Sequence, residues 1–190
     1  MQTVVLAAGS SLRMGRDKLI APFEGVPLAR RVVLGLAELH PIIVAAPPVA
    51  EALADLRDVR LIVTQPTAGP SVTLALAHAA VPPELALAVI ACDLPFLDVA
   101  LVRAFLERVP VDADLAFPVV AGTPGHPVVW SPKARARIAA LRDDESPARV
   151  RRDPALRIVE VDETDDGYVF DVDTPVAWSD AEARAARAAH

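Results

Sequence analysis

Residues 8–18 combine small side chains with three cations, directly after an apolar run at residues 3–7. The cations are Arg13, Arg16 and Lys18, and only Asp17 offsets their charge within this segment. Small residues let a backbone approach a ligand closely, and backbone N–H groups with fixed positive charge at a strand end suit a polyphosphate. The segment therefore favours an enzyme that handles a nucleotide.

The glycine-containing segment differs from two common phosphate-binding patterns. A P-loop places Lys directly after its second glycine, whereas Lys18 lies three residues beyond Gly15. The dinucleotide pattern of three spaced glycines is also absent. An ordinary strand-to-helix turn explains the glycines, but it does not explain Arg13 and Lys18 at this spacing.

Two other segments place carboxylates after apolar runs. Asp93 follows residues 86–91, and Asp171 and Asp173 precede a Thr-Pro dipeptide ahead of the last predicted helix. Alternation along an extended chain turns Asp171 and Asp173 to the same side. Because Mg²⁺ prefers carboxylate and phosphate oxygens, these acids form a candidate magnesium site. Asp93 could instead begin a turn or cap the helix that follows it, and Asp173 could cap the last helix.

The pattern Leu6-Ala7-Ala8-Gly9-x-Ser11-x-Arg13-Met14-Gly15-x-x-Lys18 resembles the signature of nucleotidyltransferases of the molybdenum-cofactor type. That group includes cytidylyltransferases and guanylyltransferases. Asp93-Leu94-Pro95 matches the Asp-x-Pro motif of the same family, and residues 171–175 resemble its Asp-x-Asp-Thr-Pro segment. The resemblance covers residues 6–175 and implies a three-layer, doubly wound, mostly parallel α/β sheet, Rossmann-like and of the nucleotide-diphospho-sugar transferase type.

The resemblance implies a nucleotide site, a metal site and catalytic residues. Its expected nucleotide-binding residues are Leu6, Ala7, Ala8, Gly9, Ser10, Ser11, Arg13, Lys18, Gly69 and Thr73. Arg13 would hold the β- and γ-phosphates, and Lys18 would lie near the α-phosphate. Asp93 and Asp173 would bind Mg²⁺, with Asp171 as the substitute for Asp173. Arg13, Lys18 and Asp93 are the expected catalytic residues.

The expected acceptor site is Gly125-His126-Pro127, which resembles the Gly-His-Pro motif of the family. Relatives often carry Arg before that glycine, whereas this chain has Pro124. His126 has a structural alternative, as a histidine with satisfied hydrogen bonds. The basic side chains at residues 149–152 could form a solvated face or contact an anionic acceptor.

The expected reaction transfers CMP from CTP to the terminal phosphate of molybdopterin, with release of pyrophosphate. The sequence Ala-Ala-Gly at residues 7–9 favours CTP over GTP, the nucleotide that the guanylyltransferases use. GTP-dependent guanylyl transfer is the first alternative, and transfer to a sugar or alcohol phosphate is another. A nucleotide-sensing domain without catalysis is the non-enzymatic alternative. Transient contact with a molybdoenzyme or its chaperone is a further expectation.

Composition excludes several classes. The 190 residues fit one domain, with a nucleotide-binding half at about 1–97, an acceptor-binding half at about 98–175 and a final helix at 176–190. A net charge of −6 argues against nucleic acid as a partner. No apolar run approaches the roughly 20 residues of a membrane span. The single cysteine, Cys92, excludes an internal disulfide and fits a reducing cytoplasm, and no targeting leader is visible.

These residues must be positioned by alternating strands and helices. In the first half we predict strands at 3–7, 42–46, 60–63 and 86–91 and helices at 28–39, 49–56 and 71–80. In the second half we predict helices at 99–109, 133–141 and 176–190 and strands at 115–119, 126–130, 157–161 and 168–170, with a turn at 165–167. This rhythm predicts a parallel sheet with helices on both faces.

Overall fold

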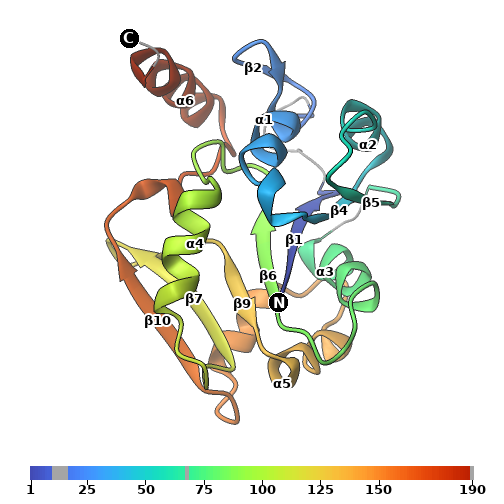
Figure 1. Ribbon diagram of the computed structural model, residues 1–190, viewed down its shortest axis with the longest axis vertical. Helices are drawn as coiled ribbons and strands as arrows, with labels where there is room; N and C mark the ends of the chain where they lie inside the picture. The colour runs from blue at the N-terminus through green and yellow to red at the C-terminus, as the bar shows by residue number, and fades with distance from the viewer. Residues whose placement is uncertain (10–16, 67–68, 189–190) are drawn as a thin grey trace.

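A computed structural model describes residues 1–9, 17–66 and 69–188 of the chain (Figure 1). In the first half, the elements are β1 (Gln2–Ala7), β2 (Pro22–Phe23), β3 (Val26–Pro27), α1 (Leu28–Gly35), η2 (Ala37–Leu39), β4 (Ile42–Ala45), α2 (Pro47–Ala52), β5 (Arg60–Val63), α3 (Pro70–Ala79) and β6 (Leu87–Ala91). In the second half, they are α4 (Val99–Arg108), β7 (Leu115–Val120), β8 (Thr123–Pro124), β9 (Val128–Trp130), α5 (Pro132–Arg135), η3 (Ile138–Ala140), η4 (Pro147–Arg152), β10 (Ile158–Glu163), η5 (Asp166–Tyr168) and α6 (Pro175–Ala188).

The main sheet has the strand order β10-β7-β9-β6-β1-β4-β5, with β8 paired to β7. Strands β5, β4, β1 and β6 are parallel neighbours, as are β10 and β7. Strand β9 runs antiparallel to both β6 and β7. The connection from β7 to β9 is too short for a crossover helix, so β9 must reverse direction. The predicted mostly parallel α/β sheet is therefore confirmed.

Alternating side chains divide the core into two layers, one on each face of the sheet. In β1, Val5 packs into the layer under α1, α2, α4 and α6, whereas Val4 packs into the layer under α3 and α5. In β6, Ile90 and Val89 divide in the same way. Helices therefore cover both faces of one sheet, as Figure 1 shows and as the three-layer prediction requires.

The predicted strand at residues 168–170 is wrong. The Asp165 carboxylate accepts a hydrogen bond from Gly167 N at 2.8 Å, and the Asp166 carbonyl accepts from Val169 N at 2.9 Å and from Phe170 N at 2.8 Å. These local bonds close the tight turn η5 and use the N–H groups that a sheet ladder would need. The turn predicted at 165–167 lies within this segment.

Smaller differences concern the ends of elements and one short hairpin. The helix predicted at 28–39 ends at Gly35 and continues as η2, and the helix predicted at 133–141 divides into α5 and η3. The strand predicted at 126–130 begins at Val128. The β2–β3 hairpin was not predicted, because each of its strands has only two residues.

A buried arginine fixes the end of α3 against α5. Arg135 is 1% exposed, and its guanidinium donates hydrogen bonds to the carbonyls of His78 at 2.9 Å, Val81 at 2.9 Å and Pro82 at 2.6 Å. It also donates to the Leu85 carbonyl. His78 lies in the last turn of α3, and Val81, Pro82 and Leu85 follow the helix, so Arg135 caps its C-terminal end.

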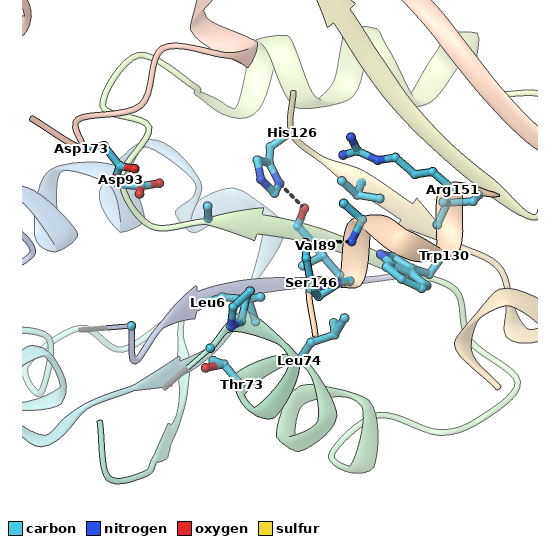
Figure 2. Close-up of a pocket in the computed structure, with 18 residues that line it drawn as sticks. Leu6, Thr73, Leu74, Val89, Asp93, His126, Trp130, Ser146, Arg151 and Asp173 are labelled. Atoms are coloured by element: carbon cyan, nitrogen blue, oxygen red, sulfur yellow. Dashed lines mark hydrogen bonds between the residues drawn. The ribbon is translucent and has the colours of Figure 1, made fainter. Parts of the chain in front are cut away.

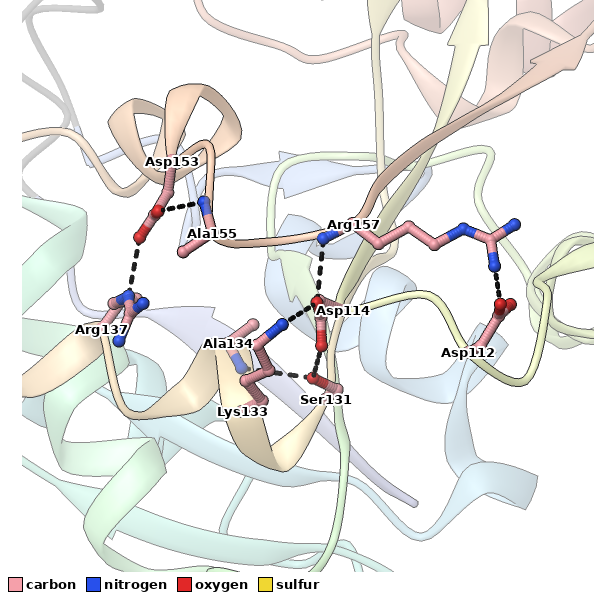
Figure 3. Close-up of polar contacts among 9 residues, drawn as sticks. All are labelled: Asp112, Asp114, Ser131, Lys133, Ala134, Arg137, Asp153, Ala155 and Arg157. Atoms are coloured by element: carbon pink, nitrogen blue, oxygen red, sulfur yellow. Dashed lines mark hydrogen bonds and ion pairs between the residues drawn. The ribbon is translucent and has the colours of Figure 1, made fainter.

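Asp114 joins three segments of the second half, as Figure 3 shows. Its carboxylate accepts hydrogen bonds from Lys133 Nζ at 2.7 Å, Arg157 N at 2.8 Å and Ser131 Oγ at 3.3 Å. The Lys133 ammonium and the Arg157 N–H hold the pKa of Asp114 below its usual value. The start of β7 is thereby tied to α5 and to the chain that enters β10.

Replacing Asp114 with Ala should lower the free energy of unfolding by about 2 kcal/mol, because it leaves a charge-assisted donor set without an acceptor. Asp112→Ala is the matched control: Asp112 pairs with Arg157 but is 63% exposed, so its loss should cost under about 0.5 kcal/mol. Urea unfolding at pH 7 measures both changes.

The effect should also depend on pH. A lowered native pKa stabilises the fold above the unfolded value of about 3.9, and this stabilisation is lost as the pH falls through the native pKa. The difference between wild type and Asp114→Ala should therefore shrink below about pH 4. Equal destabilisation by both aspartate variants would contradict the role of Asp114.

Candidate active site

Lys18, Asp93 and Asp173 meet at the carboxyl end of the central strands. Lys18 Nζ lies 2.6 Å from Asp93 Oδ2, and it also donates a short hydrogen bond to Asp173 Oδ1. Two acids that lie far apart in the sequence therefore share one ammonium group. The carboxyl ends of parallel strands are where open α/β sheets bind ligands.

A backbone hydrogen bond holds the two acidic segments together. Val172 N donates to the Asp93 carbonyl at 3.0 Å, and the Val172 side chain is fully buried. Asp173 then lies beside Asp93, whereas Asp171 is exposed. The structure thus favours Asp173 over Asp171 as the partner of Asp93.

Aromatic contacts support the same arrangement. The rings of Phe96 and Phe170 lie 5.3 Å apart edge to face, Phe96 and Phe23 lie 6.4 Å apart, and Phe23 and Trp178 lie 5.8 Å apart. Phe23, Phe96 and Phe170 lie a few residues along the chain from Lys18, Asp93 and Asp173, respectively. Edge-to-face packing of these rings fixes the three charged segments and the start of α6 relative to one another.

Neighbouring residues supply the helix caps that the acids could have provided. The carboxylate of Asp98, rather than that of Asp93, accepts a hydrogen bond at 3.0 Å from the first turn of α4. The Thr174 hydroxyl, rather than the Asp173 carboxylate, accepts one at 3.1 Å from the first turn of α6. Both acids are thus left to face Lys18.

Lys18 keeps its charge in this environment. Burial by itself lowers the pKa of its ammonium, but the adjacent carboxylates of Asp93 and Asp173 outweigh burial and raise the pKa above its usual value. Lys18 is 8% exposed, so its charge acts where water screens it little.

The acid pair fits a divalent cation that takes part of its coordination from a ligand. Among the described residues, no group of three or more His, Cys, Asp or Glu side chains could hold a metal alone. Taken by themselves, the two carboxylates and the one ammonium sum to a net negative charge. Such a site suits a hard cation that also binds phosphate oxygens and water.

A cavity of about 480 Å³ extends from the acid pair along β6, as Figure 2 shows. One wall comes from β1 and α3 and contains Leu6, Gly9, Gly69, Thr73 and Leu74. The other wall comes from β7, β9 and η4 and contains Leu115, His126, Val128, Trp130 and Arg151. The volume lies within the range of about 300–1,000 Å³ for small-molecule sites.

His126 lies on the second wall and donates to the strand beside it. Its Nδ1 is 3.1 Å from the Val89 carbonyl, which can only accept, so Nδ1 carries the proton and Nε2 keeps a lone pair. Burial keeps the pKa of His126 below its usual value, although the Val89 carbonyl and Asp93 oppose that shift. A neutral ring with one satisfied nitrogen can still accept a hydrogen bond at the other.

The structure divides the predicted nucleotide-binding residues into three groups. Leu6, Gly9, Gly69 and Thr73 line the cavity, and Lys18 contacts the acid pair beside it. Ala7 and Ala8 are buried next to it. Ser10, Ser11 and Arg13 lie outside the described residues.

The acceptor motif gives a similar division. His126 lines the cavity, while Gly125 and Pro127 are buried behind it. Of the basic residues at 149–152, only Arg151 lines this cavity. Cys92 is buried, and burial raises the pKa of its thiol, as expected for an inert core residue.

The sequence reasoning did not select Trp130 as a site residue, and it left the role of Arg151 open. A signal for Trp130 existed: residues 126, 128 and 130 alternate along one extended segment, so they share the face that bears His126. For Arg151 the irregular segment before β10 gave no periodicity from which to infer its direction.

Comparison with known proteins now identifies the family. Residues 3–161 match the family described as the MobA-like NTP transferase domain. The chain belongs to this family. The predicted enzyme class, nucleotidyltransferase, is thereby confirmed at the level of the family.

Two curated relatives are similar over the same part of the chain. Both are named probable molybdenum cofactor guanylyltransferase: one from Trichormus variabilis is 34% identical and one from a Nostoc species is 33% identical, each over 138 residues. The match covers 70% of this chain and 63% of each relative, so the chain spans less than two thirds of their length.

Solved structures confirm the fold. A Mycobacterium sp. strain JC1 homolog of the Mycobacterium tuberculosis protein Rv0371c is 23% identical, with a TM-score of 0.84 over 98% of this chain and 97% of that chain. Molybdopterin-guanine dinucleotide biosynthesis protein A from Archaeoglobus fulgidus is 19% identical, with a TM-score of 0.74 over 98% and 100%. Rv0371c itself, in complex with manganese, is 20% identical with a TM-score of 0.75 over 96% and 97%.

In the described part of the chain, no helix is long and apolar enough to cross a membrane.

Gly125 should be essential to this geometry. A Cβ at this position would lie 2.3 Å from the Tyr168 carbonyl oxygen and 2.8 Å from Val169 Cγ1, so Gly125→Ala must displace the segment that leads to Asp173. We expect Gly125→Ala to lower the free energy of unfolding by about 1–3 kcal/mol, measured by urea unfolding.

Gly35→Ala is the control for this substitution. The nearest heavy atom to its Cβ lies at 3.7 Å, which is ordinary contact, and Ala is favoured over Gly within a helix. Gly35→Ala should be neutral or stabilising. If Gly125→Ala were equally harmless, the close approach to Tyr168 would not constrain the site.

Proposed function

We propose that this protein transfers GMP from GTP to the terminal phosphate of molybdopterin, with release of pyrophosphate. The observation that supports this most is the cluster of Lys18, Asp93 and Asp173 at one end of a cavity with two different walls. One wall carries the expected nucleotide-binding residues and the other carries His126 of the expected acceptor motif.

The chemistry requires positioning more than a protein nucleophile. An oxygen of the acceptor phosphate attacks the α-phosphorus of GTP, a new P–O bond forms, and the bond to the β-phosphate oxygen breaks. The acceptor oxygen is already ionised near neutral pH, so no general base is needed. Catalysis then rests on orientation and on charge stabilisation around the α-phosphate.

Lys18 supplies fixed positive charge next to the reacting phosphate. Its raised pKa keeps the ammonium protonated, and its burial strengthens its field. Asp93 and Asp173 would hold a divalent cation, with magnesium as the expected ion, which would offset charge on the triphosphate. Arg13 remains the expected contact to the β- and γ-phosphates.

GTP replaces CTP as the preferred nucleotide in this proposal. The wording of residues 7–9 favoured CTP, but both curated relatives are named guanylyltransferases. A match across 138 residues weighs more than the short motifs, including Gly-His-Pro and Asp-x-Asp-Thr-Pro, from which CTP was inferred. Guanylyl transfer, initially the alternative, is therefore the main proposal, and CMP transfer remains unconfirmed.

The test is pyrophosphate release from each of the four NTPs with Mg²⁺ and molybdopterin. GTP should give the highest kcat/KM, and omission of either Mg²⁺ or molybdopterin should abolish release. Preference for CTP would restore the first expectation about the nucleotide. Tight GTP binding without turnover would favour a nucleotide sensor and contradict the proposal.

Asp93→Asn and Asp173→Asn should each lower kcat at least about 100-fold, because each removes a charge that orients cation and phosphates. Asp171→Asn is the matched control on the same segment, and its exposed position predicts near-normal kcat. The measurement is pyrophosphate release at saturating GTP and Mg²⁺. If Asp171→Asn were inactive and Asp173→Asn active, the assignment of the second acid would be reversed.

A further inference from the structure

The cavity continues beyond the acid pair to a second group of polar atoms, on the β9–η4 wall. The groups are the indole N–H of Trp130 and the guanidinium of Arg151 (Figure 2). Neither contacts Lys18, Asp93 or Asp173 in the described part of the chain. The reaction as argued above therefore gives these two residues no role.

Trp130 has a buried donor without an acceptor. The residue is 3% exposed, yet within the described ranges Nε1 has no hydrogen-bond partner. Its strand pairs with β6 at Leu87 and with β7 at Leu115, which fixes the backbone and leaves the indole on the cavity side. Native proteins nearly always satisfy buried donors, so an unpaired one in a cavity wall indicates a ligand.

Arg151 has a half-buried charge without an anion. Its guanidinium lies 4.2 Å from the centroid of the Phe117 ring, and no carboxylate in the described segments forms an ion pair with it. Burial lowers the pKa of Arg151, and the charge of Glu160 opposes that shift. Contact with the Phe117 ring restricts where the guanidinium can lie, and its N–H groups suit an anionic group.

The segment that carries Arg151 is itself fixed against α3. Ser71 Oγ donates to the Glu145 carbonyl at 2.5 Å, and a Cβ on Gly69 would lie 2.9 Å from the Asp143 carbonyl oxygen. The chain from Asp143 to η4 therefore crosses from the nucleotide wall to the opposite wall. Arg151 is positioned by this packing and not by an ion pair of its own.

We infer that Trp130 and Arg151 form the acceptor subsite, which binds a flat, hydrogen-bond-accepting ring and a negatively charged group of the same molecule. This inference rests on the proposed function. His126, Val128 and Trp130 alternate along one wall, so the subsite continues directly from the expected acceptor motif. Molybdopterin has both features, because its pterin ring carries carbonyl and ring-nitrogen acceptors and its dithiolene sulfurs carry negative charge, which leaves its phosphate free to reach the acid pair.

The test measures molybdopterin and GTP binding separately by titration calorimetry on the full chain. Trp130→Phe keeps the ring and removes the N–H, so the Kd for molybdopterin should rise about 3- to 10-fold. Arg151→Gln removes a charged donor, so that Kd should rise about 10- to 100-fold. The Kd for GTP should stay unchanged in both variants, which also shows that they are folded.

Matched controls are available on the same element and on the opposite face. Arg152→Gln changes an exposed arginine that follows Arg151, and Trp178→Phe changes the other indole, whose N–H already donates to Glu182 at 2.9 Å. Both should bind molybdopterin as the wild type does. Arg151→Lys should give an intermediate Kd, because it keeps the charge and loses the planar fork.

Each outcome decides the inference. Unchanged molybdopterin binding in both site variants, or loss of GTP affinity in its place, would overturn the subsite. A wild-type protein that binds GTP but not molybdopterin would overturn it as well. If the variants lose molybdopterin binding as expected but the wild type releases no pyrophosphate, the subsite stands and the proposed transfer fails.

Discussion

The structure depends on keeping two carboxylates side by side at the carboxyl end of the central strands. Asp93 and Asp173 repel each other, and they remain together because Lys18 lies between them and the Val172 N–H bonds to the Asp93 carbonyl. Water screens charges poorly in this site. Without the Lys18 ammonium, bringing the two carboxylates together there would cost much free energy. Packing among the aromatic rings of Phe23, Phe96 and Phe170 also holds these segments together against the repulsion between the two carboxylates.

The antiparallel strand β9 explains how one cavity acquires two chemically different walls. Because β9 enters the sheet between β6 and β7, it brings His126 and Trp130 alongside the strand that ends at Asp93. The nucleotide wall comes from β1 and α3, on the other side of β6. A reaction that joins two substrates needs this kind of arrangement, with each substrate held by a separate part of the chain and both reaching the same acids.

The sequence predicted the parts of this molecule in which local pattern and final structure agree. The strands predicted at 42–46 and 60–63 were correct within one residue, because short apolar runs of that length favour a strand. The segment at 168–170 failed because Asp165 and Asp166 satisfy the following N–H groups locally, and a competition between side-chain bonds and a sheet ladder has no hydrophobic signature. The pairing of Asp93 with Asp173 came from the family resemblance, since spacing in the chain gives no information about a contact made by folding.

The residues that sequence reasoning did not assign share a physical property. Among the described residues, the Trp130 N–H is buried without an acceptor and the half-buried Arg151 has no paired anion, and both features reduce the stability of a folded chain. By contrast, the buried Arg135 donates to four backbone carbonyls. Within the part of the chain that the structure describes, the cavity wall therefore contains polar groups without partners, whereas the buried Arg135 is fully hydrogen-bonded. Departures of that kind are expected where a binding partner completes the hydrogen bonds that the protein leaves open.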